Sequence, residues 1–293
     1  MNKFKWLFTP GFAAGLVFSL MLPSASADTS VWRVSNGEAT LYLAGTVHLL
    51  RESDYPLPPE YDQAYREADA LVFEVDLDAM EDLSIQARLL AEMTYNDGRT
   101  LREVLNQEAY QALEAYASEV GMPMALMQTF KPGMIVATMQ IFEFQKMGFT
   151  PEGVDAHFNV RANEDGKPVL GLETLEEQIA FLASMGEGNE SEFMLSSLRD
   201  LEGIEESMEG MISAWRSGDT ELLESMFVTE MREQAPQVYE TLLRSRNLNW
   251  VPPLIEMLGD EDIEFVLVGA AHLVGEDGLL TLLGQEGYVI EQL

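Results

Sequence analysis

A strand-Gly-x-x-His pattern occurs near both ends of the chain, and it constrains the fold more than any other feature. An apolar run leads into Gly45–His48, within residues 41–50, and a second run leads into Gly269–His272, within residues 265–274. A buried strand needs neighbouring strands to satisfy its backbone hydrogen bonds, so we expect both ends of the chain to share one sheet. The repeat also suggests two related half-units that face each other.

The residues around and between these two strands predict a helix-rich α/β protein. A hairpin is expected at 31–44 around Asn36-Gly37. Helices are expected at 58–68, 83–147, 175–185, 190–243 and 277–283, and further strands at 70–75, 169–172, 264–268 and 288–292. We therefore predict a central mixed β-sheet formed by the N- and C-terminal strands, with a large helical insertion between the two half-units. The methionine-rich helical stretches are interpreted as core filler.

The first residues have the features of a secretory signal peptide. Lys3 and Lys5 precede an apolar stretch at 11–22, and Ala25-Ser26-Ala27 offers a small-x-small cleavage site. We predict a signal peptide at 1–27, cleavage after Ala27, one domain at 28–293, and a periplasmic or secreted product. The apolar stretch is short for a membrane span, although an uncleaved anchor is the alternative. No stable membrane span is expected after cleavage.

Charge and cysteine content exclude several classes of function. The chain carries 17 basic and 50 acidic residues, a net charge of −33. Phosphate backbones are bound mainly by Lys and Arg, so no nucleic acid partner is expected, and an anionic membrane surface is equally disfavoured. The chain has no cysteine, which rules out thiol nucleophiles and thiolate metal sites.

Histidine is rare here, and its placement suggests a site. Two of the three histidines, His48 and His272, close the repeated pattern. The carboxyl ends of strands form the crevice in which α/β proteins bind ligands. Imidazole readily binds metals or moves protons near neutral pH. A single histidine in this position is usually structural, but two in equivalent positions favour a functional pair.

Acidic residues occupy comparable positions. Glu74 and Glu173 each end a predicted strand, where an ionised group must be paired, bound to metal or solvated. The plain alternative is a strand-end acid that faces water. Asp155 and His157 can form a hydrogen bond with each other, or either can orient a metal-binding side chain by a hydrogen bond to it. For His157, an ordinary structural histidine is an equally good interpretation.

Several motifs together resemble the TraB/GumN family. They are GTVHLL (45–50), FEVD (73–76), EGVDAHF (152–158), GLETLEEQ (171–178), the pair at 246–247, and GAAHLVGEDGLLTLLGQEGY (269–288). The resemblance covers nearly the whole chain after residue 27, in order. This family includes the Tiki metalloproteases and is related to erythromycin-esterase-like and haem-binding ChaN-like proteins.

The resemblance implies one α/β domain in which both motifs meet at a metal-dependent peptidase site. Mn, Co or Zn is the implied cofactor, and a peptide or protein is the implied substrate. The implied metal ligands are His48, His272, Glu74, Asp155 and His157, and the implied catalytic residues are Glu74, Glu173, Arg246 and Asn247. The last two would steady an oxyanion. Tiki proteins are tethered to membranes and no C-terminal anchor is expected here, so their substrate is not carried over.

Two other functions fit the same residues. In a metal-free hydrolase, one histidine would act as general base beside a carboxylate, as the esterase-like relatives suggest. In a binding protein, the pocket would hold a peptide, or a haem through a histidine, without converting it. A groove under helices 83–147 and 190–243 would suit an extended peptide in either case.

Overall fold

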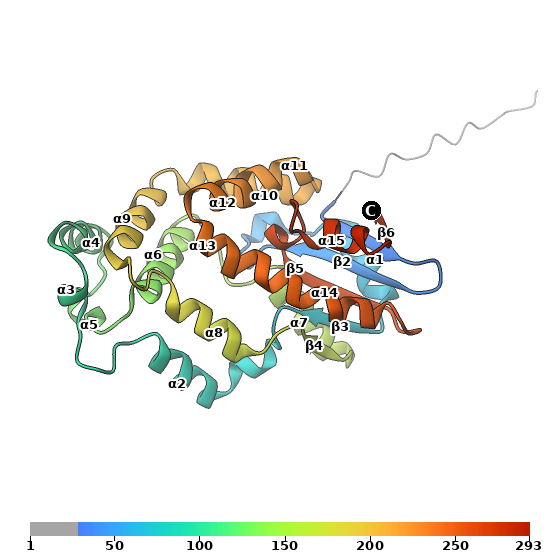
Figure 1. Ribbon diagram of the computed structural model, residues 1–293, viewed down its shortest axis with the longest axis horizontal. Helices are drawn as coiled ribbons and strands as arrows, with labels where there is room; N and C mark the ends of the chain where they lie inside the picture. The colour runs from blue at the N-terminus through green and yellow to red at the C-terminus, as the bar shows by residue number, and fades with distance from the viewer. Residues whose placement is uncertain (1–28) are drawn as a thin grey trace, which may run out of the picture.

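The computed structural model describes residues 29–293, and its strands form one mixed sheet (Figure 1). Strands β2, β3, β4 and β5 are parallel, whereas β1 is antiparallel to both β2 and β6. The order across the sheet is β4-β3-β5-β2-β1-β6. The strands are β1 (Val31–Ser35), β2 (Thr40–Thr46), β3 (Ala70–Phe73), β4 (Val169–Gly171), β5 (Glu264–Gly269) and β6 (Val289–Gln292). The predicted signal peptide lies outside the described residues.

Helices make up most of the rest of the described chain. The α-helices are α1 (Pro59–Glu67), α2 (Leu83–Glu92), α3 (Leu101–Val104), α4 (Gln107–Val120), α5 (Met124–Met127), α6 (Pro132–Lys146), α7 (Val154–Asp165), α8 (Leu175–Ser184), α9 (Glu190–Asp200), α10 (Ile204–Ser217), α11 (Thr220–Leu223), α12 (Glu230–Gln234), α13 (Pro236–Tyr239), α14 (Ser245–Met257) and α15 (Leu279–Gln285). Short 3₁₀ turns are η1 (Glu52–Asp54), η2 (Asp78–Glu81) and η5 (Ala270–His272). Two π-helical turns, η3 (Glu224–Thr229) and η4 (Glu240–Arg244), interrupt the long C-terminal helices. No helix within residues 29–293 combines the length and the apolar character needed to cross a membrane.

The predicted α/β fold with a central mixed sheet is confirmed. The strand–helix–strand unit β2–α1–β3 has parallel strands that are not neighbours, because β5 lies between them. This position explains the composition of β5. A central parallel strand is covered on both faces, and residues 265–268 are all apolar and fully buried.

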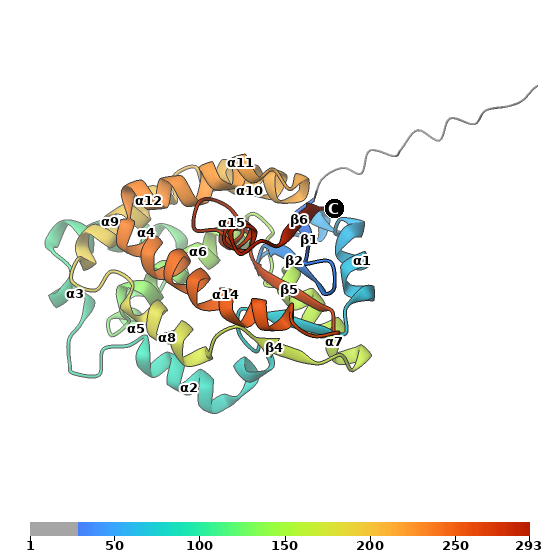
Figure 2. The same ribbon diagram turned by 45° about the vertical axis from the view of Figure 1, so that its right-hand side comes forward.

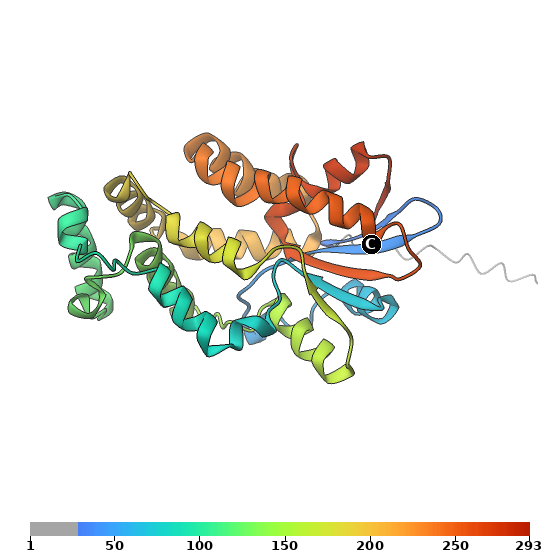
Figure 3. The same cartoon turned by 60° about the horizontal axis from the view of Figure 1, so that its bottom comes forward.

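The sheet is covered on both faces (Figure 3). On one face, Tyr61 and Tyr65 of α1 pack against Phe158 of α7, and Phe158 contacts Phe265 of β5 edge to face. Helices α14 and α15 cover the other face, and α14 runs alongside β5 (Figure 2). These layers form the main core.

The helical insertion has a second core of its own. Leu101, Leu113, Ile135, Met139 and other apolar side chains of α3, α4, α6 and α9 form an apolar cluster apart from the sheet. The insertion lies beyond the carboxyl ends of β2, β3 and β5 (Figure 1). It therefore stands over the edge of the sheet where both Gly-x-x-His motifs end.

Candidate functional site

The two Gly-x-x-His motifs lie side by side on neighbouring parallel strands. Thr46 of β2 pairs with Gly269 of β5, so the motifs are offset by one residue. Beyond the strands their paths diverge, because residues 270–272 form the 3₁₀ turn η5 whereas the chain after Thr46 continues as a loop. As a result the side chain of His272 is 5% exposed and that of His48 is 66% exposed.

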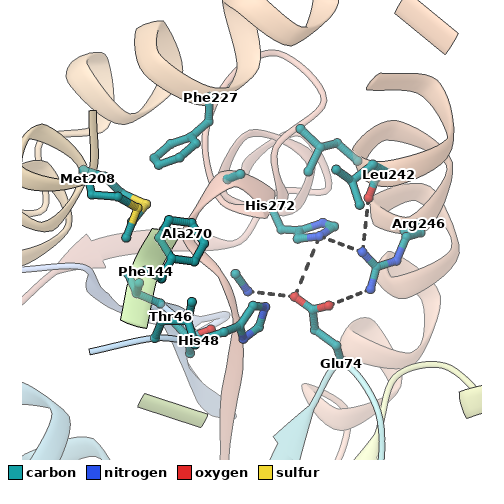
Figure 4. Close-up of a pocket in the computed structure, with 16 residues that line it drawn as sticks. Thr46, His48, Glu74, Phe144, Met208, Phe227, Leu242, Arg246, Ala270 and His272 are labelled. Atoms are coloured by element: carbon teal, nitrogen blue, oxygen red, sulfur yellow. Dashed lines mark hydrogen bonds and ion pairs between the residues drawn. The ribbon is translucent and has the colours of Figure 1, made fainter. Parts of the chain in front are cut away.

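Glu74 lies between these histidines, directly after β3 (Figure 4). Its Oε1 accepts the backbone N–H of Gly269 at 2.8 Å, and its Oε2 accepts a bond from Nη2 of Arg246 at 2.6 Å. Gly269 permits this approach, since a Cβ there would lie 3.3 Å from Oε1. The Glu74 carboxylate is therefore held at the junction of β3 and β5.

Neighbouring charges keep Glu74 ionised despite its burial. Burial alone favours the neutral acid, but the charges of His272, Arg246 and His48 and the bond from Gly269 outweigh it and lower the pKa of Glu74 to about 2. Burial also lowers the pKa of His272 to about 4, so that ring is neutral at pH 7. At neutral pH, Arg246 is therefore the cation that directly contacts Glu74.

Arg246, in the first turn of α14, joins four groups of the site. It forms a two-point ion pair with Glu173, with Nε at 2.9 Å and Nη2 at 2.7 Å from the carboxylate oxygens. Nη2 also reaches Glu74, while Nη1 donates to Nε2 of His272 at 3.0 Å and to the carbonyl of Leu242 at 3.2 Å. The planar, multi-donor guanidinium suits this arrangement.

His272 is fixed from behind by Asn247. Nδ1 of the ring lies 2.7 Å from Oδ1 of Asn247, whose Nδ2 donates to the carbonyls of His272 and Asp277. These bonds assign the proton of the neutral ring to Nδ1 and leave Nε2 as an acceptor. Asn247 is 2% exposed. Its position thus suits orientation of His272 rather than the predicted contact with an oxyanion.

His48 is held in the same way but by a carboxylate. Its Nδ1 lies 2.9 Å from Oδ2 of Asp155, in the first turn of α7. The charge of Asp155 raises the pKa of His48 to about 9, so the ring is protonated at pH 7. Nε2 of His48 has no hydrogen-bond partner among residues 29–293 and faces the pocket.

The structure does not bring every predicted residue to this site. Asp155 bonds His48 rather than His157. The His157 ring packs against Tyr55, with ring centroids 5.5 Å apart, and lines a separate cavity of about 540 Å³. Burial and the charge of Arg161 lower the pKa of His157. His48, Glu74, Glu173, Arg246 and His272 do form one cluster.

Four members of this cluster, His48, Glu74, Arg246 and His272, line a largely apolar pocket of about 450 Å³, whereas Glu173 lines a neighbouring cavity (Figure 4). The wall of the largely apolar pocket consists of large apolar side chains from the helical insertion and the following helices: Phe144, Met208, Met211, Phe227, Leu242 and Leu243. Met208 and Met211 pack in and against the main core, as the interpretation of the methionine-rich helices predicts, and both also line the pocket. Periodicity could not separate pocket wall from core, because both are apolar.

Both π-helical turns of the described chain border this pocket. Phe227 belongs to η3, Leu242 and Leu243 belong to η4, and Arg246 follows η4 by two residues. A π-turn adds a residue to the helical turn and shifts the side chains that follow, and such turns are frequent at functional sites.

Two further cavities adjoin the pocket at Arg246. One of about 350 Å³ shares His48, Glu74, Leu242 and Arg246 with it. The next, of about 710 Å³, shares Arg246 with both, and it is lined by polar groups that include Glu177, Gln178 and Asn249. All three cavities thus share Arg246 as a lining residue.

The chain resembles known proteins over most of its length. A family model described as the TraB/PrgY/gumN family matches residues 30–292. A protein of Escherichia coli (strain K12), named uncharacterized protein YbaP, is 27% identical over 248 residues, which cover 84% of this chain and 89% of that protein. The protein of the same name from Shigella flexneri is similar to the same extent. No solved structure matches the chain.

Proposed function

This chain belongs to the TraB/PrgY/gumN family, and we propose that it is an exported, metal-dependent hydrolase of peptide substrates. One observation carries the proposal. Both motif histidines are fixed at Nδ1 by a side-chain acceptor, and an ionised carboxylate lies between them on the floor of an open pocket. Metal-binding histidines in proteins are oriented in this way, by a hydrogen bond at the other ring nitrogen.

The residues at the centre fit a divalent metal in type. Neutral imidazole and carboxylate suit Mn, Co or Zn, and His48, His272 and Glu74 would hold the ion. As they lie, no three His, Asp or Glu side chains of the described chain are arranged around an ion position, and Arg246 is bonded to two of these ligands. Metal binding through Nε2 of His272 therefore requires Arg246 to release that nitrogen. A bound metal would supply hydroxide by lowering the pKa of its water to about 7.

The protein groups around the pocket favour this chemistry over metal-free hydrolysis. A general base works best with a pKa near the working pH. Glu74 and His272 have pKa values of about 2 and about 4, and His48 is already protonated at pH 7. None of them is a good base near neutrality. Arg246 is instead suited to stabilise negative charge on the carbonyl oxygen, and a metal bound at Nε2 of His48 would displace the proton from that nitrogen.

Metal content of the mature protein tests this proposal. We would compare the wild type with His48→Ala and His272→Ala by elemental analysis, and measure cleavage of a peptide library with added Mn²⁺ or Co²⁺. His157→Ala is the matched control, since the third histidine lines another cavity. We expect near-stoichiometric metal and metal-dependent cleavage in the wild type and His157→Ala, and neither in the other two variants. Absence of both from the wild type under every loading condition would overturn the proposal.

A binding function is the second candidate, and the free Nε2 of His48 beside an apolar wall favours it. Such a pocket could ligate haem iron or retain a peptide without cleaving it. A Soret band that appears on haem titration and is lost in His48→Ala, without peptide products, would support this candidate. Cleavage that survives exhaustive chelation but is lost in His48→Ala would instead indicate a metal-free hydrolase.

A further inference from the structure

We propose that the 450 Å³ pocket is a specificity pocket that takes one large apolar side chain of a neutral or basic substrate, next to the bond that is cut. This inference rests on the proposed function and names the substrate class of that site. It assigns substrate selection to the wall residues Phe144, Met211, Phe227 and Leu242.

The apolar side chains of the pocket wall are not fully covered by other parts of the protein. Phe144, Met211, Phe227 and Leu242 are each only partly buried, although they come from four separate elements that converge on one cavity. Apolar surface gathered in a concave pocket with a few polar groups is characteristic of a ligand site. Burial of an apolar ligand group there would release the water that contacts this surface.

The position of the pocket makes it a selective subsite rather than a distant binding site. His48, Glu74, Arg246 and His272 line the same pocket as the apolar wall, so a substrate side chain bound against the wall lies next to these groups. Beyond Arg246, the cavities of about 350 and 710 Å³ give the rest of an extended ligand a path. The wall is apolar on one side of the cluster, and polar residues line the far cavity on the other.

The charge of the protein restricts the ligand further. A net charge of −33 repels acidic molecules, and Glu177 adds negative charge to the far cavity. Acidic peptides should therefore be poor substrates, whereas neutral or basic peptides with one large apolar residue should be preferred.

A panel of blocked peptides that differ at one central residue tests the inference. Phe, Met, Ala and Glu would be compared at that position by kcat/KM with the metal-loaded protein, and by calorimetric Kd with the chelator-treated protein. We expect the Phe and Met peptides to exceed the Ala peptide by about 10- to 100-fold, and the Glu peptide to be poorest.

Variants of the wall then locate the preference. Phe227→Ala, and Met211→Gln, which changes polarity at similar length, should each reduce the preference for Phe over Ala several-fold. Ile141→Ala is the control, because Ile141 lies on α6 with Phe144 but is 51% exposed and does not line the pocket. It should leave the preference unchanged.

The two proposals fail in different ways. If no peptide is cleaved but the Phe peptide still binds more tightly, and Phe227→Ala removes that difference, the pocket assignment holds and the hydrolase proposal fails. If peptides are cleaved with metal but neither rate nor affinity depends on the central residue, the hydrolase stands and the specificity pocket is refuted. Indifference of both measurements in a folded, inactive protein also refutes the pocket.

Discussion

Nη1 of Arg246 donates to Nε2 of His272 across 3.0 Å, so the nitrogen expected to bind a metal is bonded to a permanent cation. The same side chain is held from the other side by two bonds to Glu173. A guanidinium and a divalent ion repel each other, and a metal at Nε2 of His272 would replace the bond that Arg246 now makes there. Arg246 thus stabilises the buried carboxylates, and its two bonds to Glu173 would hold it in the site if a metal displaced it from His272.

Arg246→Gln should strongly destabilise the protein. The side chains of Glu74 and Glu173 are each 9% exposed, and removal of their cation leaves two buried charges. Loss of one partner of a buried pair typically costs about 3–5 kcal/mol. Urea denaturation followed by circular dichroism measures the change. Arg199→Gln is the control, because the Arg199 side chain is 62% exposed and pairs with the 76% exposed Glu192 on the surface, where about 1 kcal/mol or less is expected. Equal losses of stability in the two variants would show that Arg246 does not stabilise the two buried carboxylates.

The three histidines should titrate far apart in the chelator-treated protein. We expect His48 to titrate near pH 9 and His272 near pH 4, with His157 below its ordinary value of 6.5. Proton–nitrogen correlation spectra of the imidazole rings can resolve these signals. His272 should also show the neutral form with its proton on Nδ1, as its bond to Asn247 requires. Three curves that coincide near pH 6.5 would contradict this electrostatic arrangement.

Asp155→Asn tests the cause of the raised pKa of His48. Because the charge of Asp155 is the largest contribution, its removal should bring the pKa of His48 down toward or below 6.5. Asp165→Asn on the same helix is the control, since Asp165, at the other end of α7, accepts a hydrogen bond from Tyr65. A pKa of His48 that stays near 9 in Asp155→Asn would assign the shift to another group.

The sequence predicted the strands of the site better than the partners of its side chains. Strand periodicity and the repeated motif predicted that Gly45 and Gly269 lie in one sheet, because a short buried strand must pair with other strands of the same sheet. The one-residue offset between the motifs, and the turn that buries His272 but not His48, depend on β-sheet register and tertiary packing. Neither is encoded in a ten-residue pattern.

Long-range polar contacts were the least predictable part of the site. Nothing local to Asp155 distinguishes His48, 107 residues away, from its near neighbour His157. The pocket wall was equally hidden, since Phe227 and Leu242 reach it through π-turns that helical periodicity does not show. Arg246 and Asn247 were identified through the family resemblance alone.

Glu264→Gln should stabilise the protein at high pH. Glu264 begins β5, is 6% exposed, and has an Oε2 without a partner among the described residues. Burial, reinforced by the charges of Asp260, Asp262 and Asp69, raises its pKa from 4.5 to about 7. The folded state therefore favours the neutral acid, so ionisation of Glu264 destabilises the protein. Stability is highest below pH 4.5, where the carboxyl group is protonated in both the folded and the unfolded state, and it falls as the pH rises through 7. Denaturation at pH 5 and pH 8 should show the variant about 1–2 kcal/mol more stable than the wild type at pH 8, with a smaller difference at pH 5. A difference that does not change with pH would contradict the assignment.

Gly153→Ala should disrupt the site without altering any functional side chain. Gly153 caps α7, and a Cβ there would overlap the backbone of Val47 and His48, to which α7 is tied by the bond from Val154 N–H to the Val47 carbonyl. Relief of the overlap must move α7 and carry Asp155 away from His48. We expect a loss of about 1–3 kcal/mol in stability and a lowered pKa of His48. Gly284→Ala is the matched control, because its added Cβ would meet only Ile290, at 4.0 Å, and alanine favours the helix α15 by up to about 1 kcal/mol. Thermal denaturation and the histidine titration measure both effects. An unchanged His48 in a destabilised Gly153→Ala would show that the contact serves folding and not the site.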